Sequence, residues 1–206
     1  MKHFFLLLFI VCLTGCFHQN FGSYEHYLQS RHIPPVSVSE FPHCQGYGCP
    51  QITRVSLNDQ SWSEFKYIFT PPSRSAEQER TRIKQAISLF ERKVGPLTHT
   101  DVDVGDTFKK TGKGQLDCVD ESTNTTIYMA LLEQKGWILL HDIEPPQVRT
   151  PFTTGAWPHQ TASIQDKKTG ARFAVDSWFD DNGLPPYIVP LDDWIMGWKP
   201  ADWDQR

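Results

Sequence analysis

The chain has 206 residues, of which 39% are hydrophobic and 21% are charged, so it is long and apolar enough to bury the core of one domain. Lys and Arg total 20 against 24 Asp and Glu, which gives a formal net charge of -4. No long basic run occurs along the sequence. This balance argues against a nucleic-acid partner.

The N-terminus has the pattern of a bacterial export signal. A weakly basic start at Lys2 is followed by an apolar run over residues 4–13, about half of the roughly 20 residues that span a bilayer. The following Leu-Thr-Gly-Cys, which ends at Cys16, resembles the lipobox of bacterial lipoproteins. The resemblance implies a signal peptide over 1–15 and lipidation of Cys16. Because Phe17 rather than aspartate follows, it also implies an outer-membrane lipoprotein in the cell envelope, facing the periplasm. An ordinary secretory signal is the alternative.

Export to an oxidising compartment determines how the other cysteines are interpreted. Cys44 and Cys49 flank Gln-Gly-Tyr-Gly, whose glycines allow the tight reversal of a short disulfide loop, so we expect these two to pair. A metal site that includes His43 is the alternative, but it offers only three donors. Pairing leaves Cys118 as an odd thiol, which is a candidate reactive residue.

The first half of the chain predicts a tether followed by helices. Residues 16–42 contain Gly and Pro among polar residues and predict a tether, so the domain is expected to span 43–206. A strand is expected at 52–57 and a short helix at 59–69. Ser75, with Gln78 three residues later, begins a longer helix that we expect Gly95-Pro96 to stop.

The second half predicts one more helix and a hairpin. A loop at 97–116 leads to a helix at 118–135, with Gly136 directly after its end. The remaining expected elements are a strand at 137–143, a Pro-rich loop at 144–158, strands at 159–166 and 171–178, and an irregular aromatic tail from 180. The fold class is therefore α+β.

Cys118 lies where a glycine-containing loop enters a helix. The unpaired N–H groups and the dipole at a helix N-terminus favour a thiolate. A thiolate is repelled by the nearby carboxylates of Asp117, Asp120 and Glu121, so we expect a basic partner to activate the thiol. These three carboxylates could hold a calcium ion, but carboxylates in a first turn more often complement the helix dipole. No metal or other cofactor is predicted.

The predicted hairpin supplies a basic partner. The four-residue loop 167–170, with glycine last, makes Thr161 oppose Asp176. His159 and Asp176 then share one face as diagonal neighbours, close enough for the carboxylate to orient the imidazole. We expect the opposite, apolar face to pack and this polar face to stay accessible. His141 is the alternative base, but no later aspartate faces it across a tight hairpin.

Asp-Cys-Val-Asp-Glu at 117–121, followed by a helix and by His159 and Asp176 on consecutive strands, resembles the transglutaminase-like cysteine hydrolases, most of all their bacterial cysteine-proteinase branch. The resemblance covers residues 112–182. It implies a papain-like core in which the nucleophile helix packs on an antiparallel sheet, and a triad of Cys118, His159 and Asp176.

The implied activity is hydrolysis of an amide bond in a peptide or protein substrate. Gln115, beside the Cys118 backbone N–H, is a candidate oxyanion donor. The alternative function is a catalytically silent envelope lipoprotein that binds a peptide or partner through the same cleft.

Overall fold

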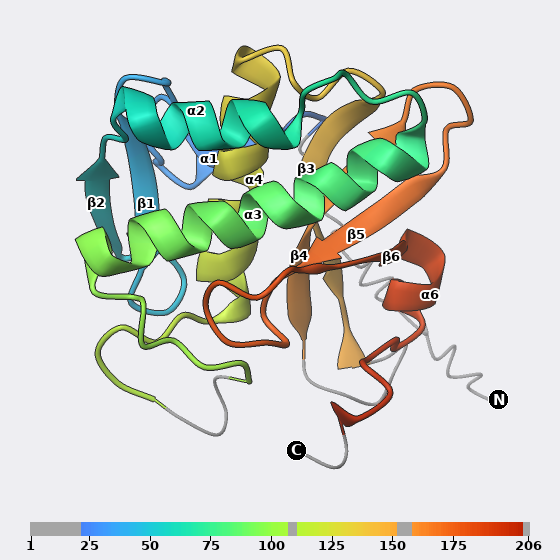
Figure 1. Cartoon of the computed structure of the whole chain (residues 1–206). Coiled ribbons are helices and arrows are strands. Elements are labelled where there is room, and N and C mark those ends of the chain that lie inside the picture. The colour runs from blue at the N-terminus through green and yellow to red at the C-terminus, as the bar shows by residue number, and fades with distance from the viewer. Residues whose placement is uncertain (1–21, 107–110, 152–157, 204–206) are drawn as a thin grey trace, which may run out of the picture.

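The computed structural model describes residues 22–106, 111–151 and 158–203, so the signal segment and Cys16 lie outside the described residues. In those ranges no helix has the length and apolar character to cross a membrane. The chain folds as α+β, with a two-stranded and a four-stranded antiparallel sheet (Figure 1). The elements in chain order are α1 (Tyr24–Ser30), β1 (Phe41–Gln45), β2 (Gln51–Val55), α2 (Asp59–Ile68), α3 (Ala76–Thr98), α4 (Cys118–Gln134), β3 (His141–Arg149), β4 (His159–Asp166), β5 (Arg172–Asp176), β6 (Tyr187–Pro190) and α6 (Leu191–Ile195).

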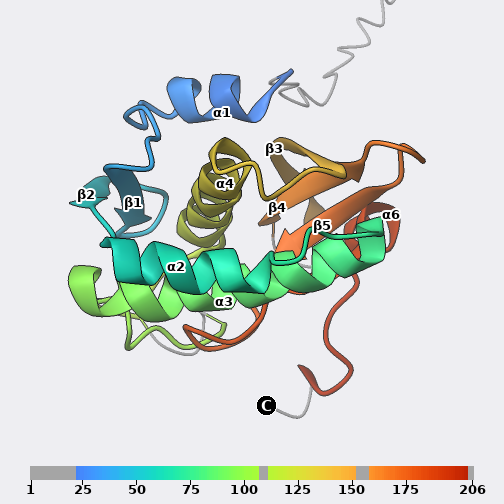
Figure 2. The same ribbon diagram turned by 45° about the horizontal axis from the view of Figure 1, so that its top comes forward.

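Helix α4 is the centre of the core. It packs against β3, β4 and β5 and against α3, and Figure 2 shows α1 on the side opposite α2 and α3. Every residue from Asp120 to Leu132 is buried, on all sides of the helix. A helix enclosed in this way has its first turn, which carries Cys118, fixed by the surrounding core.

The four-stranded sheet has the order β3-β4-β5-β6. Within it the predicted register of the β4–β5 hairpin is confirmed: Ala162 lies opposite Val175 and Ile164 lies opposite Phe173. Gly170 closes the loop with a φ of +73°, a left-handed conformation that favours glycine. The register therefore places His159 and Asp176 on one face, as the sequence predicted.

The expected strand at 137–143 and loop at 144–158 are wrong in their bounds. Strand β3 begins at His141 and continues through Pro145 to Arg149, with a bulge between Glu144 and Gln147. It is an edge strand, where the missing N–H of a proline breaks no inner ladder, and the bulge accommodates the proline pair.

The tether prediction for 16–42 is also wrong for its described part. Helix α1 lies in this segment, and Tyr27, Leu28 and Ile33 are buried in the main core. Strand β1, which begins at Phe41, was missed as well. The folded body therefore begins well before residue 43.

Helix α3 passes the expected stop at Gly95-Pro96. It begins as predicted, with Ser75 Oγ accepting from the Gln78 N–H at 3.1 Å. It then continues to Thr98, which is buried, and ends at His99 in a left-handed conformation with a φ of 61°. Burial of Gly95 and Thr98, with Thr98 Oγ1 donating to Val94 O at 3.0 Å, compensates for the single hydrogen bond that Pro96 cannot donate.

The C-terminal tail, expected to be irregular, forms β6 and α6. Leu191 and Trp194 of α6 pack on Ala174 of β5, on the sheet face that carries Asp176. Thr161 and Ser163 on this face are fully buried too. The expectation of an accessible polar face is therefore wrong, since both faces of the hairpin are covered.

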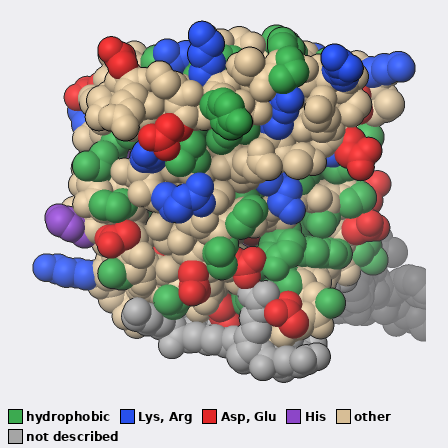
Figure 3. Space-filling model, viewed as in Figure 1, with side chains coloured by type: hydrophobic (Ala, Val, Ile, Leu, Met, Phe, Trp, Pro, Cys, Tyr) green, Lys and Arg blue, Asp and Glu red, His purple; other side chains and the backbone are tan. Residues whose placement is uncertain are grey.

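The outer surface of α2 and α3 shows the usual charged pattern of helices on a globular domain. On the face seen in Figure 3, basic and acidic side chains are interspersed over the upper part, while several acidic side chains lie together toward the lower edge. The apolar side chains of α3, including Ile83, Ile87 and Phe90, are turned inward and are fully buried.

Candidate active site

Cys118 is the first residue of α4, and Asp117 caps the helix. Asp117 Oδ1 accepts from the backbone N–H groups of Val119 at 3.0 Å and Asp120 at 2.8 Å. Asp120 Oδ2 reaches back to the Asp117 N–H at 3.4 Å, which completes a capping box. These bonds fix the backbone on both sides of the thiol.

The first turn of α4 is also bonded to a disulfide loop. The predicted Cys44–Cys49 disulfide is confirmed, and Cys118 is the free cysteine of the described residues. The loop points its Cys49 and Tyr47 N–H groups at the two carboxylate oxygens of Asp120, each at 2.7 Å. The disulfide loop therefore supports the start of the helix.

His43 takes no part in a metal site with these cysteines. Its Nδ1 is 3.0 Å from the Tyr128 hydroxyl, and burial lowers the pKa of His43 to about 3. The alternative metal assignment is therefore wrong, because both sulfurs are used in the disulfide and the imidazole is bonded inside the core.

His159 and Asp176 meet as the register requires. His159 Nε2 lies 2.9 Å from Asp176 Oδ2, and both residues are at least nine-tenths buried. The Asp176 carboxylate also accepts from the Trp178 N–H at 3.2 Å and from Trp194 Nε1 at 2.6 Å. Since a carboxylate holds the proton of a neutral imidazole on the nitrogen facing it, Nδ1 of His159 is left as the basic nitrogen.

Three aromatic rings surround the His159 imidazole. The ring centroids of Trp178, Phe179 and Trp194 lie 4.7, 5.4 and 5.4 Å from that of His159. Trp178 and Phe179 follow β5 and Trp194 belongs to α6, so two segments of the chain enclose the imidazole in a water-poor environment.

The Cys118 thiol lies beside the strand that carries His159. Its sulfur accepts a hydrogen bond from the backbone N–H of Gln160. Burial raises the pKa of Cys118 to about 12. The Gln160 N–H lowers this pKa, and the charges of Asp117 and Asp176 raise it. At neutral pH the thiol is therefore protonated, contrary to the preformed thiolate that the helix N-terminus alone would favour.

Arg149 is a further cation close to the site. It lies opposite His159 in the β3–β4 pair and is 8% exposed. Burial lowers its pKa, while the charges of Asp176 and Cys118 raise it. Sequence analysis missed Arg149 because the proline pair before it predicted a loop.

The carboxylates considered for calcium have other partners. Asp117 and Asp120 bind backbone N–H groups, and Glu121 accepts from the Ser177 hydroxyl at 2.8 Å. Over 22–106, 111–151 and 158–203, no group of three or more His, Cys, Asp or Glu residues has an arrangement suited to a metal ion.

Gln115 supports the preceding loop. Its side-chain Nε2 donates to Val102 O at 2.7 Å, and its Oε1 accepts from the Val104 N–H at 3.3 Å. The residue is 2% exposed. Both ends of the amide are therefore bonded to the backbone of one loop.

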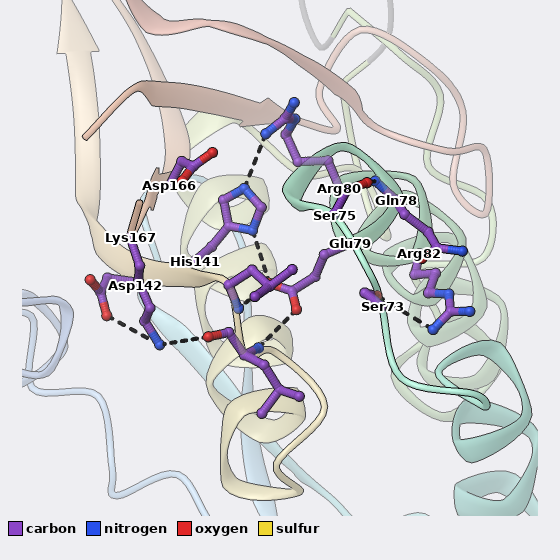
Figure 4. A network of polar contacts seen from close by, with 12 residues as sticks. Ser73, Ser75, Gln78, Glu79, Arg80, Arg82, His141, Asp142, Asp166 and Lys167 are labelled. Atoms are coloured by element: carbon purple, nitrogen blue, oxygen red, sulfur yellow. Dashed lines mark hydrogen bonds and ion pairs between the residues drawn. The ribbon is translucent and has the colours of Figure 1, made fainter. Parts of the chain in front are cut away.

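His141, the alternative base, belongs to a separate network (Figure 4). It is fully buried, with Nδ1 2.9 Å from Glu79 Oε1 and Nε2 3.2 Å from the Arg80 guanidinium. Glu79 also accepts from the N–H groups of Leu139 and Leu140, each at 2.9 Å. This network joins the start of α3 to the start of β3, which is a structural role.

Comparison with protein-family models, with curated proteins and with solved structures finds no match for this chain. The function is therefore argued from the geometry of Cys118, His159 and Asp176 alone.

Proposed function

We propose that this chain is a cysteine hydrolase of the bacterial cell envelope that cleaves an amide bond in a peptide or protein, and that its core is papain-like in the transglutaminase manner. The observation that carries the proposal is the 2.9 Å contact between His159 and Asp176, on the strand pair whose Gln160 N–H bonds the Cys118 sulfur. A thiol at a helix start, a histidine and an orienting carboxylate, in this chain order, are the parts of a nucleophilic triad.

In this reaction Cys118 is deprotonated as it attacks. The sulfur bonds to the substrate carbonyl carbon while His159 Nδ1 takes the thiol proton, and the Cys118 backbone N–H stabilises the oxyanion. Collapse breaks the C–N bond, and the imidazolium gives its proton to the departing amine. Water, deprotonated by the same imidazole, then hydrolyses the thioester to an acid and restores the thiol. Gln115 stays a candidate second oxyanion donor, because its Nε2 carries two N–H groups and Val102 O accepts from one of them.

We further propose that Cys16 carries a lipid and holds the domain at the outer membrane, facing the periplasm. Replacing Cys16 with Ser should move the protein from the membrane fraction to the soluble periplasmic fraction, because a chain without acyl groups loses its affinity for the bilayer. A Cys16→Ser protein that stays with membranes would contradict the anchor.

The catalytic proposal is tested by the reaction of Cys118 with an electrophilic thiol probe on the purified full chain. Cys118→Ala should abolish labelling, His159→Ala should nearly abolish it, and Asp176→Asn should leave a measurable residue. His26→Ala, an exposed histidine on α1, is the matched control and should label as the wild type does. Labelling that is slow and unaffected by His159→Ala would contradict the proposal.

The silent lipoprotein is the second candidate. Two observations favour it. The neutral thiol is a weak nucleophile, and the aromatic rings around His159 limit the access of a substrate to the imidazole. In that case the wild-type chain would bind a peptide or partner protein without turnover, and the rate of Cys118 labelling would not depend on His159.

A further inference from the structure

One oxygen of Asp176 has two buried partners. Oδ2 lies 2.9 Å from His159 Nε2 and accepts from Trp194 Nε1 at 2.6 Å. Trp194 is fully buried on α6, and its ring lies 5.4 Å from that of His159. The indole N–H and the imidazole therefore meet at the same carboxylate oxygen, one from the tail and one from the sheet.

Trp194 is itself held by Arg149. The guanidinium stacks 4.7 Å from the centre of the indole ring, and its NH1 donates to the backbone carbonyls of Trp194 at 3.0 Å and Trp198 at 2.8 Å. Helix α6 has five residues and no side-chain cap at its start, so its own hydrogen bonds fix it weakly. Its position depends on Arg149 and on packing against Ala174.

A carboxylate can rotate about its terminal bond, because this torsion is broad. Asp176 Oδ1 is held by the Trp178 N–H at 3.2 Å, and the shorter bond from Trp194 to Oδ2 restricts the rotation further and keeps Oδ2 directed at His159 Nε2. The proton then stays on Nε2, and Nδ1 stays the basic nitrogen.

We propose that Trp194 is a positioning residue of this site: its indole N–H fixes the Asp176 carboxylate and thereby the tautomer of His159, while Arg149 holds Trp194 in place. The kinetic consequence rests on the proposed function, whereas the tautomer does not.

The test variant is Trp194→Phe, which keeps an aromatic ring and removes the N–H. The ¹⁵N shifts of His159, assigned with His159→Gln and recorded at alkaline pH, should move from a protonated Nε2 toward averaged tautomers. Trp198→Phe is the matched control, because it keeps the carbonyl that binds Arg149, and it should leave these shifts unchanged. Unchanged shifts in Trp194→Phe would overturn the positioning role.

The rate of Cys118 labelling by the thiol probe supplies the second readout. Trp194→Phe should lower the rate constant about tenfold, as the loss of one hydrogen bond implies. In an Asp176→Ala background, which removes the acceptor, Trp194→Phe should lower it less than about twofold further, because the two residues act as one unit. An undiminished effect in that background would show that Trp194 acts only through the fold.

The two proposals fail separately. A wild-type Cys118 that does not react, together with altered His159 shifts in Trp194→Phe, would remove the hydrolase and leave the positioning role. If wild-type Cys118 reacts and Trp194→Phe matches the wild type in both readouts, the positioning role is removed and the hydrolase remains.

Discussion

The environment of Cys118 determines when the thiol can react. Because burial raises the pKa of Cys118 to about 12, the thiolate is scarce at neutral pH and increases with each step toward alkaline pH. In His159→Ala, which lacks the general base, the rate of alkylation by iodoacetamide should rise about tenfold per pH unit and continue to rise beyond about pH 9, where an ordinary thiol levels off. Measured labelling rates from pH 5 to pH 10 test this. A plateau reached below neutral pH would instead demonstrate a preformed thiolate.

Gly114 sets the path of the chain into α4. Its φ is +77°, and a Cβ atom there would lie 2.3 Å from the backbone oxygen of His99. Gly114→Ala should therefore lower the free energy of unfolding by about 2–4 kcal/mol, since the left-handed strain adds to a contact with rigid backbone. Urea unfolding measures it. Gly136→Ala, with a φ of +69° and open space around it, carries only the strain and should lose about 1 kcal/mol. Equal losses in the two variants would refute the close approach.

At the scale of elements, the contact between α4 and the disulfide loop should be cooperative. Asp120→Asn leaves one partly buried N–H of the loop without an acceptor and should cost about 2 kcal/mol of unfolding free energy. The Cys44→Ala, Cys49→Ala double variant should cost about 2 kcal/mol, as a loop this short implies. Without the disulfide the loop can shift, so the further cost of Asp120→Asn should fall below about 1 kcal/mol.

Denaturant unfolding of the four proteins measures that coupling. Glu40→Gln is the control, because Glu40 forms an exposed ion pair with Arg54 at 2.8 Å, and it should cost less than about 0.5 kcal/mol. Strict additivity between Asp120→Asn and the cysteine variant would show that the helix and the loop do not support each other.

The elements that could be predicted are those fixed by local chemistry. Hairpin β4–β5 was predicted with its register because a loop with a terminal glycine allows only one pairing, and α3 was predicted to start after Ser75 because the cap is local. Strand β3 was misplaced because its prolines are tolerated only at a sheet edge, and neighbouring strands decide which strand is the edge.

The part of the site that depends on local chemistry could also be predicted. His159 and Asp176 follow from the hairpin, but their enclosure depends on contacts between distant segments. Trp194 and Arg149 are 45 residues apart in the sequence, and no local pattern indicates that they stack. The thiol's raised pKa was missed for the same reason, since burial is a property of the packed molecule.

At the scale of the whole molecule, a group of buried acids sets the response to pH. Burial raises the pKa of Glu91 to about 8 and that of Asp103 to about 7, and it holds that of Glu121 well above its usual value. Glu121 shares a hydrogen bond with Asp103, and Glu91 Oε1 is buried without a partner. In the unfolded chain these acids ionise near pH 4, so stability falls as the pH rises from there through the folded-state values.

The melting temperature should therefore be higher at pH 5.5 than at pH 8, by at least about 5 °C. Glu79 and Asp166 have lowered pKa values, so they affect stability only at more acidic pH. His43, with its pKa lowered to about 3, acts in the opposite direction below about pH 6.5, but it is one group against three acids. Calorimetric scans across the range supply the measurement. Glu91→Gln should flatten the dependence, while Glu77→Gln, an exposed acid on the same helix, should not. A melting temperature that increases toward pH 8 would contradict the assignment.

The inclusion of α1 in the folded body limits the distance at which the proposed enzyme can work. Tyr27 of α1 is bonded to Thr123 of α4 at 2.9 Å and to the side chain of Gln160, next to His159, at 2.9 Å. Only six peptide steps separate Cys16 from Gly22, and a fully extended chain of that length reaches about 20 Å. With Cys16 in the bilayer, as proposed, the site works within a few nanometres of the membrane. Bonds deep in the periplasm would lie beyond its reach, and substrates would have to come to the membrane surface.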